Sequence, residues 1–569
     1  MTKKILLLLL CVLCFLPARS FARSVPDQAR AGAAERTFAE KEAERRLQEE
    51  LLPIVLSQQP ESEAVIPAEA RLTVRGFSFR GNTVFSSRRL LGSLAGYFGR
   101  ELSFAELQDA CRVLTAFYRK SGYFLAYAFL PVQDIKDGIV LIEIAEGRIG
   151  SVTVEGARYY SPGFIRSHFH AGSGDVANYK ALLKSLFLLN EYRDLDVKAR
   201  FLKGRQPYTV DVVLKVQDKR TFHGLVDYNN FGSRYIAKNR TGLMLEHTNV
   251  FLPGARLSMR TVAGSPLRNV FFGRMAYSLP LNSYGTKAEL SWLRSDFNVQ
   301  KEYRDLDAGG LTEICSLSLS HPLQRTHLTS ADLSFGFDHK TIQDYLLGSV
   351  NSRDDLRVFR TGLDYDHKDS FRGRNAVSAL LSYGAADIWG GSARNDDLAS
   401  RQGAGGEFLK TNMDLARFQQ FLGDSYLVMR ASGQVASDVL PVSEQFALGG
   451  PDSVRGFSQS EYLGDLGLSS GLELRFLPPF WASGTVPFLR RQFDDFLQFL
   501  TFVDYGRAYL KNPVAGESKN YELAGAGIGL RMQFTSDFNV RMDLGFPLSG
   551  REPSQDNDPV LYVQGVSRF

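Results

Sequence analysis

The sequence predicts a transmembrane antiparallel β-barrel, preceded by two small α+β modules and an N-terminal helix. Three observations predict this fold class: an apolar leader opens the chain, a β-α-α-β-β pattern occurs twice, and apolar and polar residues alternate over residues 220–569. The 569 residues are 44% hydrophobic and 23% charged, with a mean hydropathy of −0.16. These averages also fit a large soluble protein, because a barrel places polar residues between its apolar ones.

The first 22 residues have the layout of a secretory signal peptide. Lys3 and Lys4 precede an apolar run over residues 5–16, and small Ser20 and Ala22 occupy the −3 and −1 positions of a cleavage site. A spanning helix needs about 20 apolar residues, so this run is too short to be an anchor. Cleavage would remove three basic residues and lower the formal net charge from +5 to +2. A nearly neutral mature chain gives no reason to expect a nucleic-acid partner.

Residues 23–52 are predicted to contain a polar helix. The stretch 35–52 is rich in Ala, Glu and Arg, with many charge pairs at i,i+4 spacing. Its apolar positions are sparse, so it does not look like a core helix. Residues 53–70, with three prolines among Ser and Gln, are predicted to form an extended linker.

Two β-α-α-β-β units follow, over residues 71–147 and 148–217. Each begins with a strand that ends in glycine, and Gly156 of the second unit lies 75 residues after Gly81 of the first. Apolar residues at steps of three and four predict a long helix over residues 104–120. The closing strands are predicted at 124–132 with 139–145, and at 195–202 with 209–216. Each unit can bury one face of a sheet under two helices, which predicts two α+β modules.

Strict alternation replaces helical periodicity over residues 218–569. Its clearest segments are Lys287–Trp292, Ala524–Phe534 and Phe538–Phe546. A soluble sandwich also alternates, but here Arg, Asp and Gln stand opposite an aromatic-rich face, the pattern of a barrel with lipid outside and water inside. At roughly 20–24 residues for each strand with its turns, the length predicts about 14–18 strands, in an even number. The final segment Leu561–Phe569 alternates and ends in an aromatic residue, as a closing strand would.

No motif indicates catalysis, a cofactor or a metal. Gly467–Gly471 matches G-x-S-x-G by letter, but an alternating strand follows where a nucleophile elbow needs a helix. In Gly525–Gly529 the glycines occupy every second position of a strand, so we expect them to leave space inside the wall rather than to bind phosphate. His168 and His170 are expected to be a surface pair, because no third histidine is close in the sequence and Asp175 is the only nearby carboxylate. We therefore expect a protein that is not an enzyme.

Two short segments of the barrel region are informative. Leu448–Phe457 combines paired glycines, a proline and Val-Arg-Gly-Phe, which favours a structured loop. On the alternating strand around Phe502, Asp504 points inward if Phe502 and Gly506 share its face. A loop arginine and a wall carboxylate that face one lumen could form a bidentate pair. An ordinary surface loop and a solvated wall carboxylate are the alternatives at this point.

These segments resemble two motifs of the outer-membrane translocator and assembly-factor superfamily. The residues that resemble its loop motif are Val454, Arg455, Gly456 and Phe457. Those that resemble its wall motif are Phe502, Asp504 and Gly506. The two repeats resemble polypeptide-transport-associated (POTRA) domains, and Gly464–Gly467 followed by Glu473–Phe476 is similar to the branch of two-partner secretion translocators (TpsB type, haemolysin secretion/activation proteins).

The resemblance implies a more specific fold and site. It implies sixteen strands, a loop folded into the lumen, and a pair between Arg455 and Asp504. Gly456 would permit the tight tip, Phe457 would pack against the wall, and Phe569 would be the terminal strand signal. The helix over residues 35–52 would plug the pore at rest.

The resemblance also implies a function and a location. The protein would be a passive export pore in the outer membrane of a Gram-negative bacterium, with its POTRA domains in the periplasm. These domains would capture a large unfolded partner, a haemolysin, adhesin or toxin, and strand addition to a sheet edge is one binding mode. We also expect contact with outer-membrane lipid and with the barrel assembly machinery during biogenesis, no nucleic acid, and a monomeric pore.

Two other functions stay open from the sequence. An outer-membrane assembly factor or insertase would share the motifs, although such relatives usually carry more periplasmic repeats. A solute porin would explain the barrel and leave the repeats and the loop motif unexplained.

Overall fold

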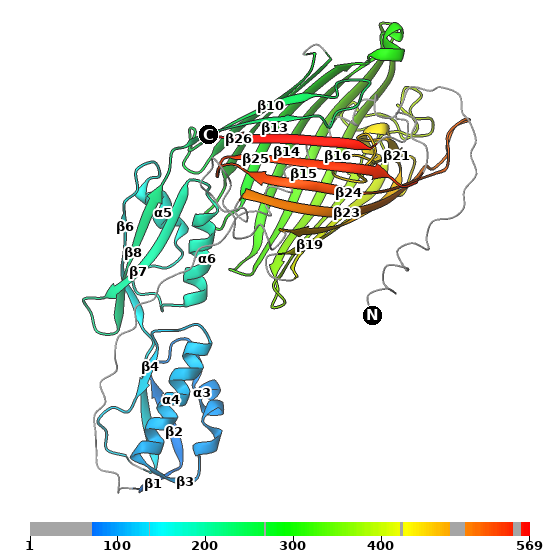
Figure 1. Ribbon diagram of the computed structural model, residues 1–569. Helices are drawn as coiled ribbons and strands as arrows, with labels where there is room; N and C mark the ends of the chain where they lie inside the picture. The colour runs from blue at the N-terminus through cyan, green and yellow to red at the C-terminus, as the bar shows by residue number, and fades with distance from the viewer. Residues whose placement is uncertain (1–70, 136, 267–268, 422–424, 478–495, 550–558) are drawn as a thin grey trace, which may run out of the picture.

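The computed structural model describes residues 71–135, 137–266, 269–421, 425–477, 496–549 and 559–569. The predicted signal peptide, N-terminal helix and linker lie outside the described residues. The described chain forms a barrel from one end of which two α+β modules extend in a row (Figure 1). Among the helices of these residues, none is apolar over the length that crossing a membrane requires.

The first module packs two helices on one face of a sheet. Its elements are β1 (Arg71–Val74), β2 (Gly76–Arg80), α3 (Ser87–Ser93), β3 (Arg100–Ser103), α4 (Phe104–Lys120), β4 (Tyr127–Phe129) and β5 (Ile139–Ala145). In the order β2-β5-β4, β2 is parallel and β4 antiparallel to β5. A reciprocal capping box between Ser103 and Glu106 begins α4.

Two details of the first module differ from the prediction. The strand predicted over 124–132 is only the three residues of β4, and Pro131 just beyond it has no N–H to donate to a ladder. The short strand β3, which pairs with β1, was not predicted. Its four residues, Arg-Glu-Leu-Ser, show too little alternation to be recognised.

The second module repeats the β-α-α-β-β order. Its elements are β6 (Arg148–Glu155), α5 (Pro162–His168), α6 (Tyr179–Asn190), β7 (Leu195–Lys203) and β8 (Thr209–Asp218). The sheet order is β6-β8-β7, with β6 parallel and β7 antiparallel to β8. Ser161 and Asn178 cap the two helices with side-chain oxygens.

The expectation of a surface histidine pair is wrong for His168. Its side chain is 5% exposed and packs against the rings of Phe164 and Tyr192. Nδ1 lies 2.9 Å from the carbonyl oxygen of Phe164. Burial lowers the pKa of His168 below its usual range.

Acid should therefore destabilise the second module. Because the unfolded chain binds the proton at a higher pH than the folded one, this stability is present above about pH 6.5 and is lost as the pH falls below it. We expect amides of residues 148–217 in the full-length protein to lose hydrogen-exchange protection at pH 5.5 relative to pH 7.5, after correction for intrinsic exchange. The variant His168→Gln does not titrate at this position and should lose much less protection between pH 7.5 and pH 5.5. Equal protection of the wild type at both pH values would contradict the prediction.

The rest of the described chain closes into a barrel of sixteen antiparallel strands, which confirms the predicted fold class. The strands are β9 (Phe222–Asn229), β10 (Arg240–Thr248), β11 (Arg256–Gly264), β12 (Val270–Pro280), β13 (Lys287–Asn298), β14 (Gly309–Arg325), β15 (Thr329–Leu346), β16 (Ser349–Lys368), β17 (Gly373–Gly384), β18 (Phe408–Gln420), β19 (Tyr426–Ala436), β22 (Leu466–Phe476), β23 (Leu497–Tyr509), β24 (Asn520–Gln533), β25 (Phe538–Pro547) and β26 (Val560–Arg568). β26 pairs with β9 to close the ring.

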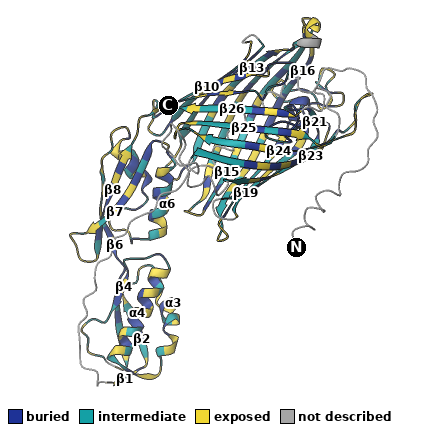
Figure 2. Ribbon diagram, in the orientation of Figure 1, coloured by how far each residue is buried: buried dark blue, intermediate teal, exposed yellow. Residues whose placement is uncertain are grey.

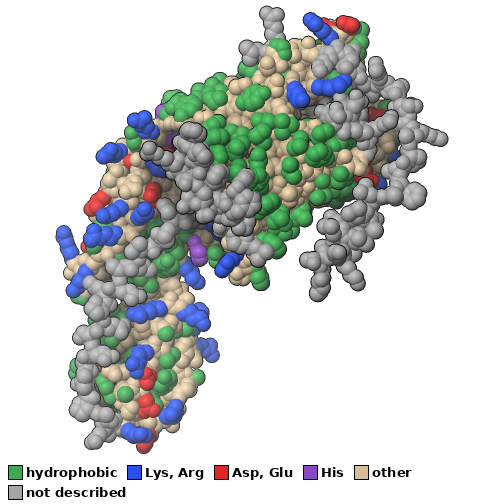
Figure 3. Space-filling model, in the orientation of Figure 1, with side chains coloured by type: hydrophobic (Ala, Val, Ile, Leu, Met, Phe, Trp, Pro, Cys, Tyr) green, Lys and Arg blue, Asp and Glu red, His purple; other side chains and the backbone are tan. Residues whose placement is uncertain are grey.

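The barrel wall alternates as the sequence predicts. On β13, Leu290 and Trp292 are half exposed on the outside, whereas Ser291 between them is buried. Figure 3 shows hydrophobic side chains over the outer face of the barrel, and Figure 2 shows exposed and buried residues alternating along its strands. Phe569 continues the closing strand, because its backbone exchanges hydrogen bonds of 2.9 and 3.0 Å with Gly224.

The second module is joined to the barrel by polar contacts at the end of α6. Asp194, 1% exposed, accepts from Thr248 Oγ1 at 2.6 Å and lies 2.5 Å from His223 Nε2. Arg193 pairs with Glu246 at 3.0 Å. These contacts hold the module against the adjoining ends of β9 and β10.

Candidate functional site

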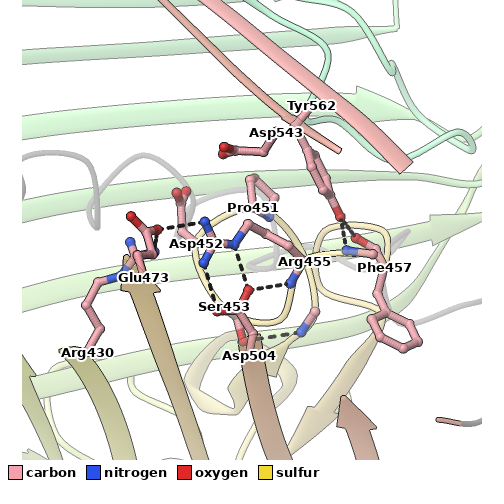
Figure 4. Close-up of polar contacts among 12 residues, drawn as sticks. Arg430, Pro451, Asp452, Ser453, Arg455, Phe457, Glu473, Asp504, Asp543 and Tyr562 are labelled. Carbon is pink, nitrogen blue, oxygen red and sulfur yellow. Dashed lines mark hydrogen bonds and ion pairs between the residues drawn. The ribbon is translucent and has the colours of Figure 1, made fainter. Parts of the chain in front are cut away.

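The site is a loop folded into the barrel between the short strands β20 (Phe446–Leu448) and β21 (Tyr462–Gly464). We call residues 451–457 the loop tip. Val454, Arg455 and Phe457 in it are 0% exposed. The tip contacts the inner faces of β22 to β26 (Figure 4).

Arg455 makes the central contacts of the loop tip. Its Nε and Nη2 donate to the two carboxylate oxygens of Asp504 at 2.6 and 2.8 Å, and its backbone N–H donates to the same carboxylate at 3.1 Å. Its Nη1 donates to Glu473 at 2.6 Å. The guanidinium carbon lies 3.5 Å from the ring centre of Phe502, a cation–π distance. A bidentate charged pair of this kind fixes both the position and the orientation of the loop.

The three wall-motif residues lie on one face of β23. Phe502, Asp504 and Gly506 are buried, whereas Val503 and Tyr505 between them are exposed on the outside. The loop motif and the wall motif, about 50 residues apart in the sequence, therefore meet in the lumen. Phe457 and Val454 share an apolar cluster with Ala508 and Leu523 of the wall.

Glu473 belongs to this site, a role that was not predicted from the sequence. It is 1% exposed and accepts hydrogen bonds from Arg430 at 2.7 Å, from Arg455, and from Arg475 at 2.8 and 3.0 Å. The sequence could have predicted that Glu473 points inward, because β22 alternates and Leu472 and Leu474 on either side face outward. It could not have predicted the partners of Glu473, because Arg430 and Arg455 lie on other segments.

Glycines make room for the loop tip. Gly456 has φ of +104°, and a Cβ there would come within 2.9 Å of the β25 backbone, so only glycine suits this position. Across the contact, a Cβ on Gly525 of β24 would collide with the carbonyl oxygen of Arg455. Among the alternating glycines of β24, Gly525 thus admits the loop, a more specific role than the open space expected from the sequence.

Two further wall residues hold the tip, and neither was singled out from the sequence. Tyr562 of β26 donates to the carbonyl of Phe457 at 2.5 Å and accepts from the N–H of Gly456 at 3.1 Å. Arg541 of β25 donates to the carbonyl of Pro451 at 2.9 Å. Asp504, Glu473, Arg541 and Tyr562 together we call the tip-binding wall.

A second set of contacts holds the base of the loop. The buried carboxylate of Asp465 accepts from Arg401 at 2.7 Å and from the backbone N–H groups of Leu440 and Lys511 at 2.8 and 2.7 Å. Glu444 pairs with Lys340 and Lys410 at 2.9 and 2.6 Å. Because these partners come from separate strands and loops, the base of the loop is fixed across the lumen.

This site is suited to holding a loop. Its charged groups are paired with one another, and within the described ranges no three His, Cys, Asp or Glu side chains gather as metal ligands would. Buried ion networks of this type are stable only while every member keeps its partner.

Glu473→Gln should loosen the loop without emptying its site. The variant keeps the side-chain shape but leaves three guanidiniums around a neutral amide, at a cost on the order of 3 kcal/mol. Folded and unfolded barrel migrate differently in gels, and we expect the variant to change from the folded to the unfolded band at a lower temperature than the wild type. Glu522→Gln, an exposed residue of β24, is the control and should convert as the wild type does, and equal conversion temperatures for Glu473→Gln would contradict the assignment.

Family models match most of the chain. One described as "Haemolysin secretion/activation protein ShlB/FhaC/HecB" matches residues 209–532. One described as "POTRA domain, ShlB-type" matches residues 72–147. The heme/hemopexin transporter protein HuxB of Haemophilus influenzae is 22% identical over 493 residues, which are 84% of this chain and 83% of HuxB.

Solved structures share the fold. CdiB from Escherichia coli, 21% identical, superposes with a TM-score of 0.76 and covers 97% of this chain and 100% of its own. CdiB from Acinetobacter baumannii, 16% identical, has a TM-score of 0.72 with the same coverage. Both are similarities of fold, and they span the modules and the barrel together.

Proposed function

The chain belongs to the haemolysin secretion/activation protein family ShlB/FhaC/HecB, and from that membership we propose how it exports its partner. It is a two-partner secretion transporter of the outer membrane, with POTRA domains in the periplasm. Transporters of this family act as secretion channels and pair with secreted proteins such as haemolysins or toxins. In our proposal the partner crosses the barrel along the part of the lumen that the loop tip leaves uncovered.

The mechanism rests on one observation, the burial of Val454–Phe457 of the loop tip against one side of the wall. Contacts of the tip go to β22–β26. The opposite wall, from β11 to β17, meets the base of the loop where Lys340 of β15 pairs with Glu444. The rest of this wall is left for an unfolded partner that passes along the polar lumen. The buried Arg455–Asp504 pair keeps the tip in place while the partner moves.

The segments before residue 71 complete this proposal. The polar helix over residues 35–52 occupies the lumen at rest and leaves it during transport, since a charged surface suits a wet pore and not lipid. The sequence holds no nucleotide-binding motif, and folding of the partner outside the cell supplies the driving force. The pore works as a monomer in outer-membrane lipid, where the barrel assembly machinery places it through the terminal strand that ends at Phe569.

Co-expression tests the function. The chain is produced together with a large secreted protein encoded beside its gene, and the partner is measured in the medium and in the periplasm. We expect the partner in the medium only when the chain is present, with other outer-membrane barrels at unchanged levels. Release of the partner without the chain would contradict export, and a general loss of other barrels on deletion would instead indicate an assembly factor.

A further inference from the structure

Three aromatic rings form a row across the two periplasmic modules. Tyr127 and Phe129 lie on β4, at the end of the first module that adjoins the second module (Figure 1). Tyr208 lies in the second module, between β7 and β8. The ring of Phe129 stacks on Tyr127 at 6.0 Å with planes 15° apart, and on Tyr208 at 6.2 Å with planes 23° apart. We call these three residues the aromatic row.

The aromatic row faces water. Tyr127 is 48% and Tyr208 61% exposed. Ala126 and Ala128 point into the core, so Tyr127 and Phe129 lie on the opposite face of the sheet. Exposed aromatic rings that stack on one another in this way indicate an interaction site.

Tyr208 occupies a backbone conformation that disfavours it. Its φ is +58°, in the left-handed region where glycine or asparagine is preferred and a bulky side chain is strained. A tyrosine retained at such a turn costs stability, and such outliers gather where the side chain has a task. Here the strained residue supplies the third ring of the row.

Near the row, side chains already satisfy backbone groups of β4, β5 and β7, which disfavours strand addition at these positions. On β4, the N–H of Ala128 donates to Thr115 Oγ1 at 3.0 Å. On β5, the amide of Gln133 bonds both the N–H and the carbonyl of Leu141 at 2.7 Å. In the second module, the side-chain amide of Asn190 accepts from the N–H of Val197 on β7 at 2.7 Å and donates to its carbonyl at 3.1 Å. Strand addition needs such groups free, so at these positions the partner is recognised through side chains.

We infer that the aromatic row binds the exported partner as an extended chain, through apolar side chains at every second position. Side chains on one face of an extended chain repeat every ~6.4–6.8 Å, close to the 6.0 and 6.2 Å between the rings. Beside Phe129 on β5 lies Glu143, which pairs with Arg80 at 3.8 Å. The row itself carries no charge, which suits apolar side chains. It spans both modules, so it guides the chain toward the barrel. This inference rests on the proposed function, export of an unfolded partner.

Two labelled peptides test the row on the full-length protein in lipid nanodiscs. One alternates valine with threonine and serine over ten positions between terminal lysines, and the other has the same composition with its five valines in one block. Fluorescence anisotropy should show at least about fivefold tighter binding of the alternating peptide. The double variant Phe129→Ser with Tyr208→Ser should lose at least about fivefold of that affinity. Tyr159→Ser, a half-exposed tyrosine of the second module outside the row, should bind as the wild type does.

Several results would overturn the inference. Equal affinity for the two peptides, or wild-type affinity in the double variant, would do so. A dimer in light scattering that the double variant breaks would assign the row to a second copy of this chain. Tighter peptide binding after deletion of residues 53–70 would assign it to the chain's own linker.

Export of the co-expressed partner separates this inference from the proposed function. If the wild type exports the partner and the peptide results fail, only the aromatic row loses its role. If the wild type exports nothing, the proposed function fails whatever the peptides show.

Discussion

Arg455→Ala should leave the barrel inserted in the outer membrane and lower export of the partner at least about tenfold. The substitution removes the donor for Asp504 and one of the donors for Glu473, both 1% exposed. Breaking one side of a buried network costs about 3–5 kcal/mol, because the remaining charges lose their partner and cannot regain water. The tip would leave the tip-binding wall and obstruct the passage.

The measurement compares partner in the medium with the amount of folded barrel in the outer membrane. Arg507→Ala is the matched control, since Arg507 lies on the same strand as Asp504 but is exposed on the outer face. Arg455→Lys should export at an intermediate level, because lysine keeps the charge but lacks the planar fork. Wild-type export by Arg455→Ala would remove the pair from the mechanism.

Gly525→Val should abolish most export without changing any charge. A Cβ at this position collides with the carbonyl oxygen of Arg455, and a backbone atom cannot move aside as a side chain can. The loop tip would therefore fail to seat although every member of its ion network is present. We expect a loss of export of about tenfold, similar to the loss in Arg455→Ala.

The control for this variant is the next residue. Ala526→Val enlarges a side chain of the same strand on the outer face, and export should stay within about twofold of the wild type. Loss of export in both variants would indicate damage to the strand itself. Normal export by Gly525→Val would show that the tip need not sit where the structure places it.

Local patterns were enough to predict much of the architecture. The alternation of apolar and polar residues at Leu290, Ser291 and Trp292 distinguished the lipid-facing side of the strand from its lumen-facing side. Apolar residues at steps of three and four located α4 at residues 104–120. The short strand β3 was not predicted from the sequence, because its four residues are too few to show a periodic pattern. The burial of His168 was not predicted, because a single histidine forms no periodic pattern and only the packing of the module decides whether its side chain is buried.

The candidate site divides in the same way. The loop residues Val454–Phe457 and the wall residues Phe502, Asp504 and Gly506 were identified in the sequence, since each motif is contiguous or alternates on one strand. The roles of Glu473 and Tyr562 were not predicted, because each contacts the tip from a different strand. Closure of the barrel brings β22 and β26 to the same loop, and no local pattern encodes that distance.

By itself the sequence determined the two α+β modules, the lipid-facing and lumen-facing sides of the clearly alternating strands, and the two motifs. Periodicity suffices for these, because a strand or helix shows its faces in the order of its own residues. Only the tertiary structure decided that Arg455 joins Asp504 to Glu473 above the ring of Phe502, and that β24 presents glycine where the loop arrives. Those contacts depend on strand register and loop insertion, which are set by the packing of segments far apart in the chain.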